Sequence, residues 1–417
     1  MIASKGLNGL FLLEAGPVVC VSRFFQRLVF VLSAVIFSAL GLGLVMGELG
    51  YFGVHASGQQ AGAYHQMRAY AEVLQKVQSD YVTDPNMGEV TDGALHGLVE
   101  SLDPDSSYMT PTEYKIYKDH PAVDTAQVGI HISKRYGYAT VVSILPNSPA
   151  DKDHLADGDV IESIDGQSTH ELPLAVIRMM LEGKPGTTVQ ISVVRPMKPD
   201  PDKLTVTRAD IAVPALAQQQ YENSTILYLK PLVLTAARVD AIAALIKASG
   251  KDRKILLDLR DCYGEDIQQG VRLANFFIQQ GTLAKVEGQK YPMQTFTADP
   301  AKYLTGAPLA VLVNRGTYGA PEIAAAAIEA AKRGDVVGER TFGEGVVQKT
   351  IEMPDGAALL LTVAKYESPD GKKIEDVAVT PTITVNPPID SQIEGAPAPK
   401  DDLILDKGLE LLKAKSA

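Results

Sequence analysis

The chain has 417 residues, of which 46% are hydrophobic, and it carries a formal net charge of −11 at pH 7. This length is sufficient for two or three globular domains, and the acidity argues against nucleic acid as a partner. Two cysteines give no disulfide framework, and the sequence has neither a His/Cys cluster with metal-site spacing nor a phosphate-binding glycine motif. We therefore expect no metal and no organic cofactor.

The first predicted element is a membrane-spanning helix at residues 28–47, an uncharged apolar run of sufficient length. Arg23 and Arg27 precede the run and Glu48 follows it, so the positive-inside rule places residues 1–27 in the cytoplasm and the bulk of the chain outside. A cleaved signal peptide is the alternative. The run is long for such a peptide, however, and no small-x-small cleavage motif closes it, which favours an uncleaved anchor.

A linker and a helical region are predicted for residues 48–120. Small residues dominate the linker at 53–62, and the apolar residues after it recur at helical spacing. This spacing predicts an amphipathic helix whose apolar face packs in a core. The residues of that face are Met67, Tyr70, Leu74, Val77 and Tyr81.

A second predicted helix, from Met87 to Ser101, runs into the segment SLDPDSSYMTPTEY at residues 101–114. Asp-Pro in this segment ends one helix, and Thr110-Pro111 begins another. The segment therefore reads as a helix stop, and we predict a structural role for its residues, Asp105 included.

Residues 121–212 are predicted to form a β-rich domain that resembles a PDZ domain. The resemblance rests on the motif Asn-Ser-Pro-Ala at 147–150 and on Leu-Ala-Asp-Gly-Asp-Val-Ile at 155–161. It implies a groove that takes an extended C-terminal peptide as an added strand and holds its carboxylate on backbone N–H groups. The candidate peptide-binding residues are Val128, Gly129, Ile130, His131 and Ile132. For His131, a surface or packing role is favoured over contact with a peptide.

Strands and helices alternate from residue 213 to 395, which predicts a largely parallel and buried sheet. An apolar strand at 309–313 leads into a turn, and Pro321 with Glu322 then opens an alanine-rich helix. A glycine loop follows at 341–345. Turns and helix N-termini after buried strands leave backbone N–H groups free to contact a ligand, so we place the candidate site here.

The stretch 311–348 resembles the catalytic core of the carboxy-terminal processing proteases, or tail-specific proteases, of serine peptidase family S41. That family reads approximately N-x-G-S-A-S-A-S-E-I and then T-F-G-K-G-x-V-Q. The matching residues are Asn314, Gly316, Ala320, Glu322, Ile323, Thr341, Phe342, Gly343, Gly345, Val347 and Gln348. The resemblance implies a mixed fold: a membrane helix, a helical segment, a PDZ-like domain, a ClpP/crotonase-like α/β core at 213–395, and a C-terminal linker and helix at 396–417.

The resemblance places the family's catalytic residues on positions that lack the required chemistry. The nucleophilic serine falls on Gly319 and the basic lysine on Glu344, whereas Gln348, which orients the base in the family, is retained. In the oxyanion loop Gly264 is kept but the second glycine is Glu265, whose carboxylate would repel the developing negative charge. No intact catalytic set is therefore expected.

The sequence thus predicts a pseudoprotease, because losing the nucleophile and the base removes the route to an acyl-enzyme. We expect it to be anchored in a bacterial inner membrane, to face the periplasm or the exterior, and to bind unfolded protein C-termini. An active protease or an envelope complex is a further expected partner. The alternative is a serine-type endopeptidase with a relocated nucleophile, for which Thr317, Tyr318 and Cys262 are candidates.

Glu265 and Glu344 could bind a cation between them. Two solvated carboxylates are the commoner arrangement for acidic residues on neighbouring loops.

Overall fold

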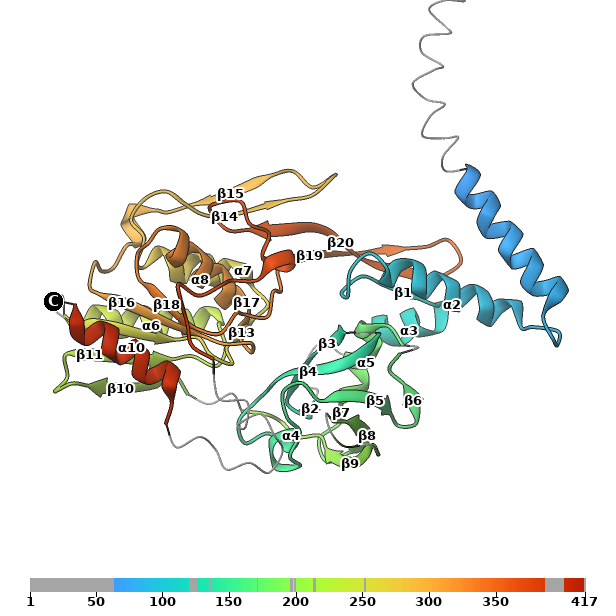
Figure 1. Cartoon of the computed structure of the whole chain (residues 1–417), viewed down its shortest axis with the longest axis horizontal. Helices are drawn as coiled ribbons and strands as arrows, with labels where there is room; N and C mark the ends of the chain where they lie inside the picture. Colours follow the sequence, from blue (N-terminus) through green and yellow to red (C-terminus); the bar gives the residue numbers. More distant parts are fainter. Residues whose placement is uncertain are drawn as a thin grey trace, which may run out of the picture. The chain divides into compact units, whose positions relative to one another are not determined.

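The computed structural model describes residues 64–119, 126–135, 137–170, 172–195, 198, 200–212, 215–250, 253–386 and 401–415 (Figure 1). The predicted membrane helix at 28–47 lies outside these residues, and the predicted domain boundaries adjoin or fall within the segments left out, so both stay predictions. Within the described ranges, no helix combines the length and the apolar character needed to cross a bilayer. The chain divides into two compact units, Met1–Met87 and Gly88–Ala417.

The described part of the first unit is mainly a helix at residues 64–80. Its predicted apolar face does not pack in a core: Met67 is 66% exposed, Tyr70 42% and Tyr81, just after the helix, 61%. The expectation of core packing was therefore wrong for these residues. Helical spacing predicts a stripe of apolar side chains, but it contains no information about what covers the stripe.

The second unit begins with the predicted helix–stop–helix segment, which appears as α2 (Met87–Glu100), β1 (Ser107–Met109) and α3 (Pro111–Asp119). In the connecting loop, the Asp103 carboxylate accepts hydrogen bonds from the backbone N–H groups of Asp105 and Ser106. Strand β1 pairs with β20 (Ala358–Glu367) in the α/β core. The loop is thereby fixed against the core, far from it in sequence.

An antiparallel sheet with the PDZ-like order β3-β4-β5-β8-β9 follows, with β6 paired to β5. Its strands are β3 (Ile130–Arg135), β4 (Tyr138–Ile144), β5 (Val160–Ile164), β6 (Gln167–Ser168), β8 (Thr188–Val194) and β9 (Asp202–Thr207). The short strands β2 (Ala126–Gln127) and β7 (Glu182–Gly183) pair beside them, and the helices are α4 (Pro149–Lys152) and α5 (Leu174–Leu181). Strand β3 is the outermost strand of this sheet.

The central sheet of the core has the order β10-β11-β12-β16-β18-β21, parallel except for the β10–β11 pair. The strands are β10 (Ala217–Tyr221), β11 (Ile226–Lys230), β12 (Lys254–Asp258), β16 (Leu309–Val313), β18 (Asp335–Gly338) and β21 (Ile383–Thr384). In β16, Leu309, Val311 and Val313 pack toward one hydrophobic cluster and Ala310 and Leu312 toward another. The predicted parallel sheet, buried on both faces, is confirmed.

Helices cover both faces of this sheet. The first cluster contains residues of α6 (Ala236–Ser249), α7 (Ile267–Asn275) and α8 (Ala320–Ala330), and the second contains residues of α10 (Leu403–Ala414). A second, antiparallel sheet of order β1-β20-β14-β15, with β19 on β20, lies beside them. Its remaining strands are β14 (Thr282–Glu287), β15 (Gln294–Thr297) and β19 (Val346–Glu352), and the short helices η1 (Pro300–Lys302) and α9 (Ile374–Val377) complete the core.

One very short parallel pair positions the candidate site. Strand β13 (Tyr263–Gly264) pairs with β17 (Tyr318–Gly319), so that Gly264 lies opposite Gly319. The backbone of Gly264 packs closely against Ala320: a Cβ at position 264 would lie 2.9 Å from the Ala320 side chain. The pair therefore brings the loop after β12 directly against the start of α8.

Candidate functional site

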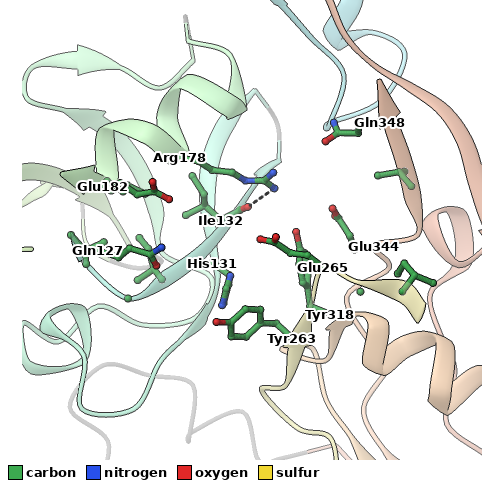
Figure 2. A pocket seen from close by; sticks show the side chains of 18 residues that line it. Gln127, His131, Ile132, Arg178, Glu182, Tyr263, Glu265, Tyr318, Glu344 and Gln348 are labelled. Carbon is green, nitrogen blue, oxygen red and sulfur yellow. Dashed lines mark hydrogen bonds between the residues drawn. The ribbon is translucent and has the colours of Figure 1, made fainter. Parts of the chain in front are cut away.

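A cavity of about 440 Å³ lies between the PDZ-like sheet and the α/β core of the second unit (Figure 2). The PDZ-like side contributes the segment 127–132 together with Arg178, Leu181 and Glu182. The core side contributes residues of β13, β17, the glycine loop and β19. The candidate peptide-binding residues and the family's catalytic and oxyanion-loop positions all line this cavity: Val128, Gly129, Ile130, His131, Ile132, Gly264, Glu265, Gly319, Glu344 and Gln348.

Gly319 occupies a position where a side chain has no room. Its backbone has φ +71° and ψ −121° at the N-cap of α8, a conformation that side-chain-bearing residues rarely adopt. A Cβ built on it would lie 2.4 Å from the carbonyl oxygen of Gly264. The Gly264 carbonyl, and not its N–H group, is thus the group nearest to the family's nucleophile position. Any side chain at position 319 therefore requires the Gly264 carbonyl to move.

Glu322 holds the turn at Gly319 and the glycine loop together. One carboxylate oxygen accepts from the N–H groups of Gly319 (2.9 Å) and Glu344 (2.8 Å). The other oxygen accepts from the Gly343 N–H (2.7 Å) and from the Thr341 hydroxyl. Complete burial raises the pKa of Glu322 to about 7, against the lowering effect of these donors. Glu322 thus fixes the turn at Gly319 against the glycine loop. The serine and the lysine of the family are absent from these two segments, which carry Gly319 and Glu344 instead.

Glu344 points into the cavity (Figure 2) and forms a side-chain hydrogen bond with Tyr318. Burial raises its pKa well above the ordinary value, and the neighbouring carboxylate of Asp105 raises it further, while Arg178 lowers it. A glutamate in this setting resists ionisation.

The structure brings Asp105, for which a structural role was predicted, next to the cavity-lining residue Glu344. One oxygen atom each of Asp105, Glu344 and Glu375 lies within 4.8 Å of the other two. Asp105 is 4% exposed, and burial raises its pKa. The proximity of Asp105 to the glycine loop could not be predicted, because the two segments are more than two hundred residues apart in sequence. Glu375 was not predicted as a site residue because it belongs to no motif. The group of three does not include Glu265, the residue that was weighed beside Glu344 for a cation.

Arg178 is a further site residue without a sequence signal. It lies on α5, and its Nη2 donates to the carbonyl oxygen of Ile132 at 3.4 Å (Figure 2). The same nitrogen lies 3.8 Å from Oδ1 of Asp105. Arg178 therefore places a positive charge between the predicted peptide-binding strand and the carboxyl cluster.

His131 packs between the two halves of the site. Its ring centroid lies 4.0 Å from that of Tyr263 and 5.9 Å from that of Tyr318. Burial, aided by Arg178, lowers the pKa of His131 to about 4, so the ring is neutral at pH 7. Its position matches the packing interpretation, and the ring joins the PDZ-like strand β3 to the core.

The residues weighed as relocated nucleophiles do not form a reactive constellation. Thr317 is fully buried and its hydroxyl donates to the carbonyl oxygen of Leu259 at 2.8 Å. Cys262 is also buried, and burial raises the pKa of its thiol. Neither residue lines the cavity, whereas Tyr318 does, in contact with Glu344. Gln348, which orients the base in the family, donates to the backbone carbonyl of Asp105 at 2.6 Å.

A PDZ-like sheet joined to an α/β core, with a shared cavity at the family motifs, defines the chain as a PDZ-containing member of the S41 peptidase class. Family profiles agree: peptidase family S41 matches residues 229–385, and the PDZ domain matches residues 126–207. The chain is 31% identical to the carboxyl-terminal-processing protease of Picosynechococcus, over 76% of this chain and 77% of that protein. The carboxy-terminal-processing protease of Bartonella bacilliformis is 28% identical, with 81% and 79% coverage.

Solved structures show the same fold. The photosystem II D1 C-terminal processing protease superposes with a TM-score of 0.62 at 23% identity, covering 78% of this chain and 95% of that chain. The chain belongs to the carboxy-terminal processing protease family, peptidase family S41.

Proposed function

We propose that this chain is a catalytically inactive family member that binds unfolded protein C-terminal tails. The observation that carries the loss of proteolysis is Gly319, which offers no nucleophile at the family position. The adjoining geometry supports it, since the Gly264 carbonyl occupies the space where a nucleophilic side chain would begin. Glu344 in place of the basic lysine, and Glu265 in place of an oxyanion-loop glycine, support it independently.

The tail-binding part of the proposal rests on β3 and α5. Strand β3 is paired only with β4 in the described sheet, so its other edge is available to an added peptide strand. The segment 127–132 lines the cavity, and Arg178 adds a positive charge where a terminal carboxylate would arrive. Two relatives are named as carboxy-terminal processing proteases, and a C-terminal tail as the ligand agrees with these names.

Membrane anchoring and location form the last part of the proposal. They rest on the apolar run at residues 28–47 and on Arg23 and Arg27 before it. An anchored tail-binding protein in the bacterial envelope would hold unfolded proteins near a membrane-bound active protease or an envelope complex. Fractionation of cells tests the anchor: the chain should leave the membrane with detergent and not with high salt or carbonate. Release by salt alone would reject a spanning helix.

The function itself is tested with the full-length chain in detergent and an unfolded protein with an apolar C-terminus. We expect binding without cleavage, weakened when the tail is amidated or when Arg178→Gln is introduced. Arg238→Gln, on helix α6 and outside the cavity lining, is the matched control and should leave binding unchanged.

Cleavage by the unmodified chain would contradict the proposal. Its loss on Cys262→Ala or Thr317→Val would then identify a relocated nucleophile, the alternative that the sequence left open. Binding that is indifferent to amidation would contradict recognition of the terminal carboxylate.

A further inference from the structure

We propose that the carboxyl groups of Asp105, Glu344 and Glu375 form a binding site for a divalent cation of the calcium type. The proposal goes beyond tail binding and does not depend on it. The three residues come from three separate segments: the loop between α2 and β1, the glycine loop at 341–345, and α9. A cation shared by them would join these segments at one point.

The spacing of the oxygen atoms fits a calcium ion. One oxygen of each carboxylate lies within 4.8 Å of the other two. A calcium ion binds oxygen ligands at about 2.3–2.6 Å, so two ligands on opposite sides are about 5 Å apart. Magnesium requires ligands at about 2.0–2.1 Å in a near-ideal octahedron, which this set matches less well. An all-oxygen donor set also disfavours zinc and copper, which prefer nitrogen and sulfur ligands.

Asp105 provides a second and independent observation. Its side chain is 4% exposed, and Oδ1 accepts no hydrogen bond from any described residue. The guanidinium of Arg178, at 3.8 Å, is beyond hydrogen-bond distance. Buried carboxylate oxygens are normally hydrogen-bonded, ion-paired at close range or bound to a metal. Asp105 Oδ1 thus forms an ion pair with Arg178 but accepts no hydrogen bond, so it can still act as a ligand to a cation beside two further carboxyl groups.

The local charge balance also favours a cation. Asp103 raises the pKa of both Asp105 and Glu375, so four acidic groups act on the site. Two basic groups oppose them: Arg178, which lowers the pKa of Asp105 and Glu344, and Lys365, which lowers that of Asp105 and Glu375. The balance is negative. Either protons or a cation must offset it, and a divalent ion would neutralise the excess while satisfying the geometry.

Terbium luminescence gives a direct test with the full-length chain, because Tb³⁺ binds calcium sites and is excited by nearby aromatic rings. The chain has 16 tyrosines and no tryptophan, and Tyr318 forms a hydrogen bond with Glu344. We expect sensitised Tb³⁺ emission that Ca²⁺ displaces, with a Ca²⁺ dissociation constant of about 10⁻⁴ to 10⁻³ M, the range of extracellular modules. Tyr318→Phe should lower the emission measured at saturating Tb³⁺, where a change in affinity has no effect.

Ligand variants locate the site. Asp105→Asn and Glu375→Gln should each weaken Ca²⁺ binding at least about tenfold, a loss that even outer-shell partners can cause. Glu265→Gln is the matched control: it removes a carboxylate that lines the same cavity but lies outside the cluster, and should preserve binding. Circular dichroism in the absence of metal checks folding. The proposal is overturned if the unmodified chain binds no Ca²⁺ up to 10 times the expected range (about 10⁻² M), or if Glu265→Gln weakens binding as much as Asp105→Asn does.

Discussion

Gly319 has no side chain, and the structure leaves no space for one at this position. Its φ of +71° is a conformation that glycine adopts freely, and the Gly264 carbonyl lies 2.4 Å from the position of a Cβ. A serine at this position of this chain would need a different arrangement of the loop that contains Gly264. The substitution is therefore coupled to its surroundings and is more than a missing hydroxyl.

Gly319→Ser is expected to destabilise the folded chain. A Cβ there forces both the backbone strain and a displacement of the β13–β17 pair, whereas Gly250→Ser introduces only strain, because Gly250 has φ +85° and nothing within 4 Å of its Cβ. The cost of overpacking should make the first variant less stable than the second by about 1–3 kcal/mol. Thermal and urea unfolding measure this difference. Equal stabilities would mean that Gly264 moves aside freely.

Glu322 is the residue on which the surviving frame depends. Glu322→Gln leaves the length of the side chain unchanged but presents an NH₂ group to two of the four donors that the carboxylate accepts from. Leaving buried donors unpaired should cost about 2–4 kcal/mol of unfolding free energy. Glu329→Gln on the same helix, α8, serves as the control. A loss no larger than that of the control would show that the carboxylate does not hold the two loops.

At the scale of elements, the strands and helices with clear periodicity were predicted correctly. The apolar run 309–313 is β16, and Pro321 and Glu322 lie in the first turn of α8. The β13–β17 pair could not be predicted, because a strand of two residues has no periodicity. Asp105 and Glu375 were missed for a related reason: only the pairing of β1 with β20 and the fold of α9 bring them to the glycine loop. Local patterns specify elements, whereas this site is made by contacts distant in sequence.

The contact of β3 with β13 and β17 should weaken in acid, because His131 lies in it. The histidine packs against Tyr263 and Tyr318 and faces Arg178, and its pKa of about 4 lies below the ordinary 6.5. As the pH falls below 6.5, the unfolded chain binds the proton first, so stability is lost progressively down to about pH 4. His131→Phe keeps an aromatic ring and should flatten this part of the stability profile.

Urea unfolding of His131→Phe and the unmodified chain at several pH values between 4 and 7 measures the effect. His65→Gln, at an exposed histidine of the helix 64–80, is the control and should follow the unmodified chain. Parallel profiles for all three proteins would show that His131 does not titrate in this contact.

At the scale of the whole molecule, the PDZ-like loop and the family's catalytic positions share one cavity. A tail bound along β3 would therefore end beside Gly319, Glu344 and the carboxyl cluster. In a working relative this arrangement would deliver a peptide to a nucleophile. Here the same route leads to the carboxyl group of Glu344 and to the Gly264 carbonyl.

Restoring proteolysis should consequently require more than the two missing residues. Gly319→Ser with Glu344→Lys supplies a hydroxyl and an amine, but the Gly264 carbonyl still faces position 319 and Glu265 still repels an oxyanion. We expect cleavage of an unfolded substrate by this double variant to stay at background on gels.

Adding Glu265→Gly gives the loop the freedom to turn an N–H group toward the site. Cleavage by the triple variant should therefore exceed cleavage by the double variant. The same triple variant with Gly319→Ala in place of Gly319→Ser lacks the hydroxyl and is the control. A double variant as active as the triple one would mean that the oxyanion loop is already competent, and that only the two reacting groups separate this chain from an active protease.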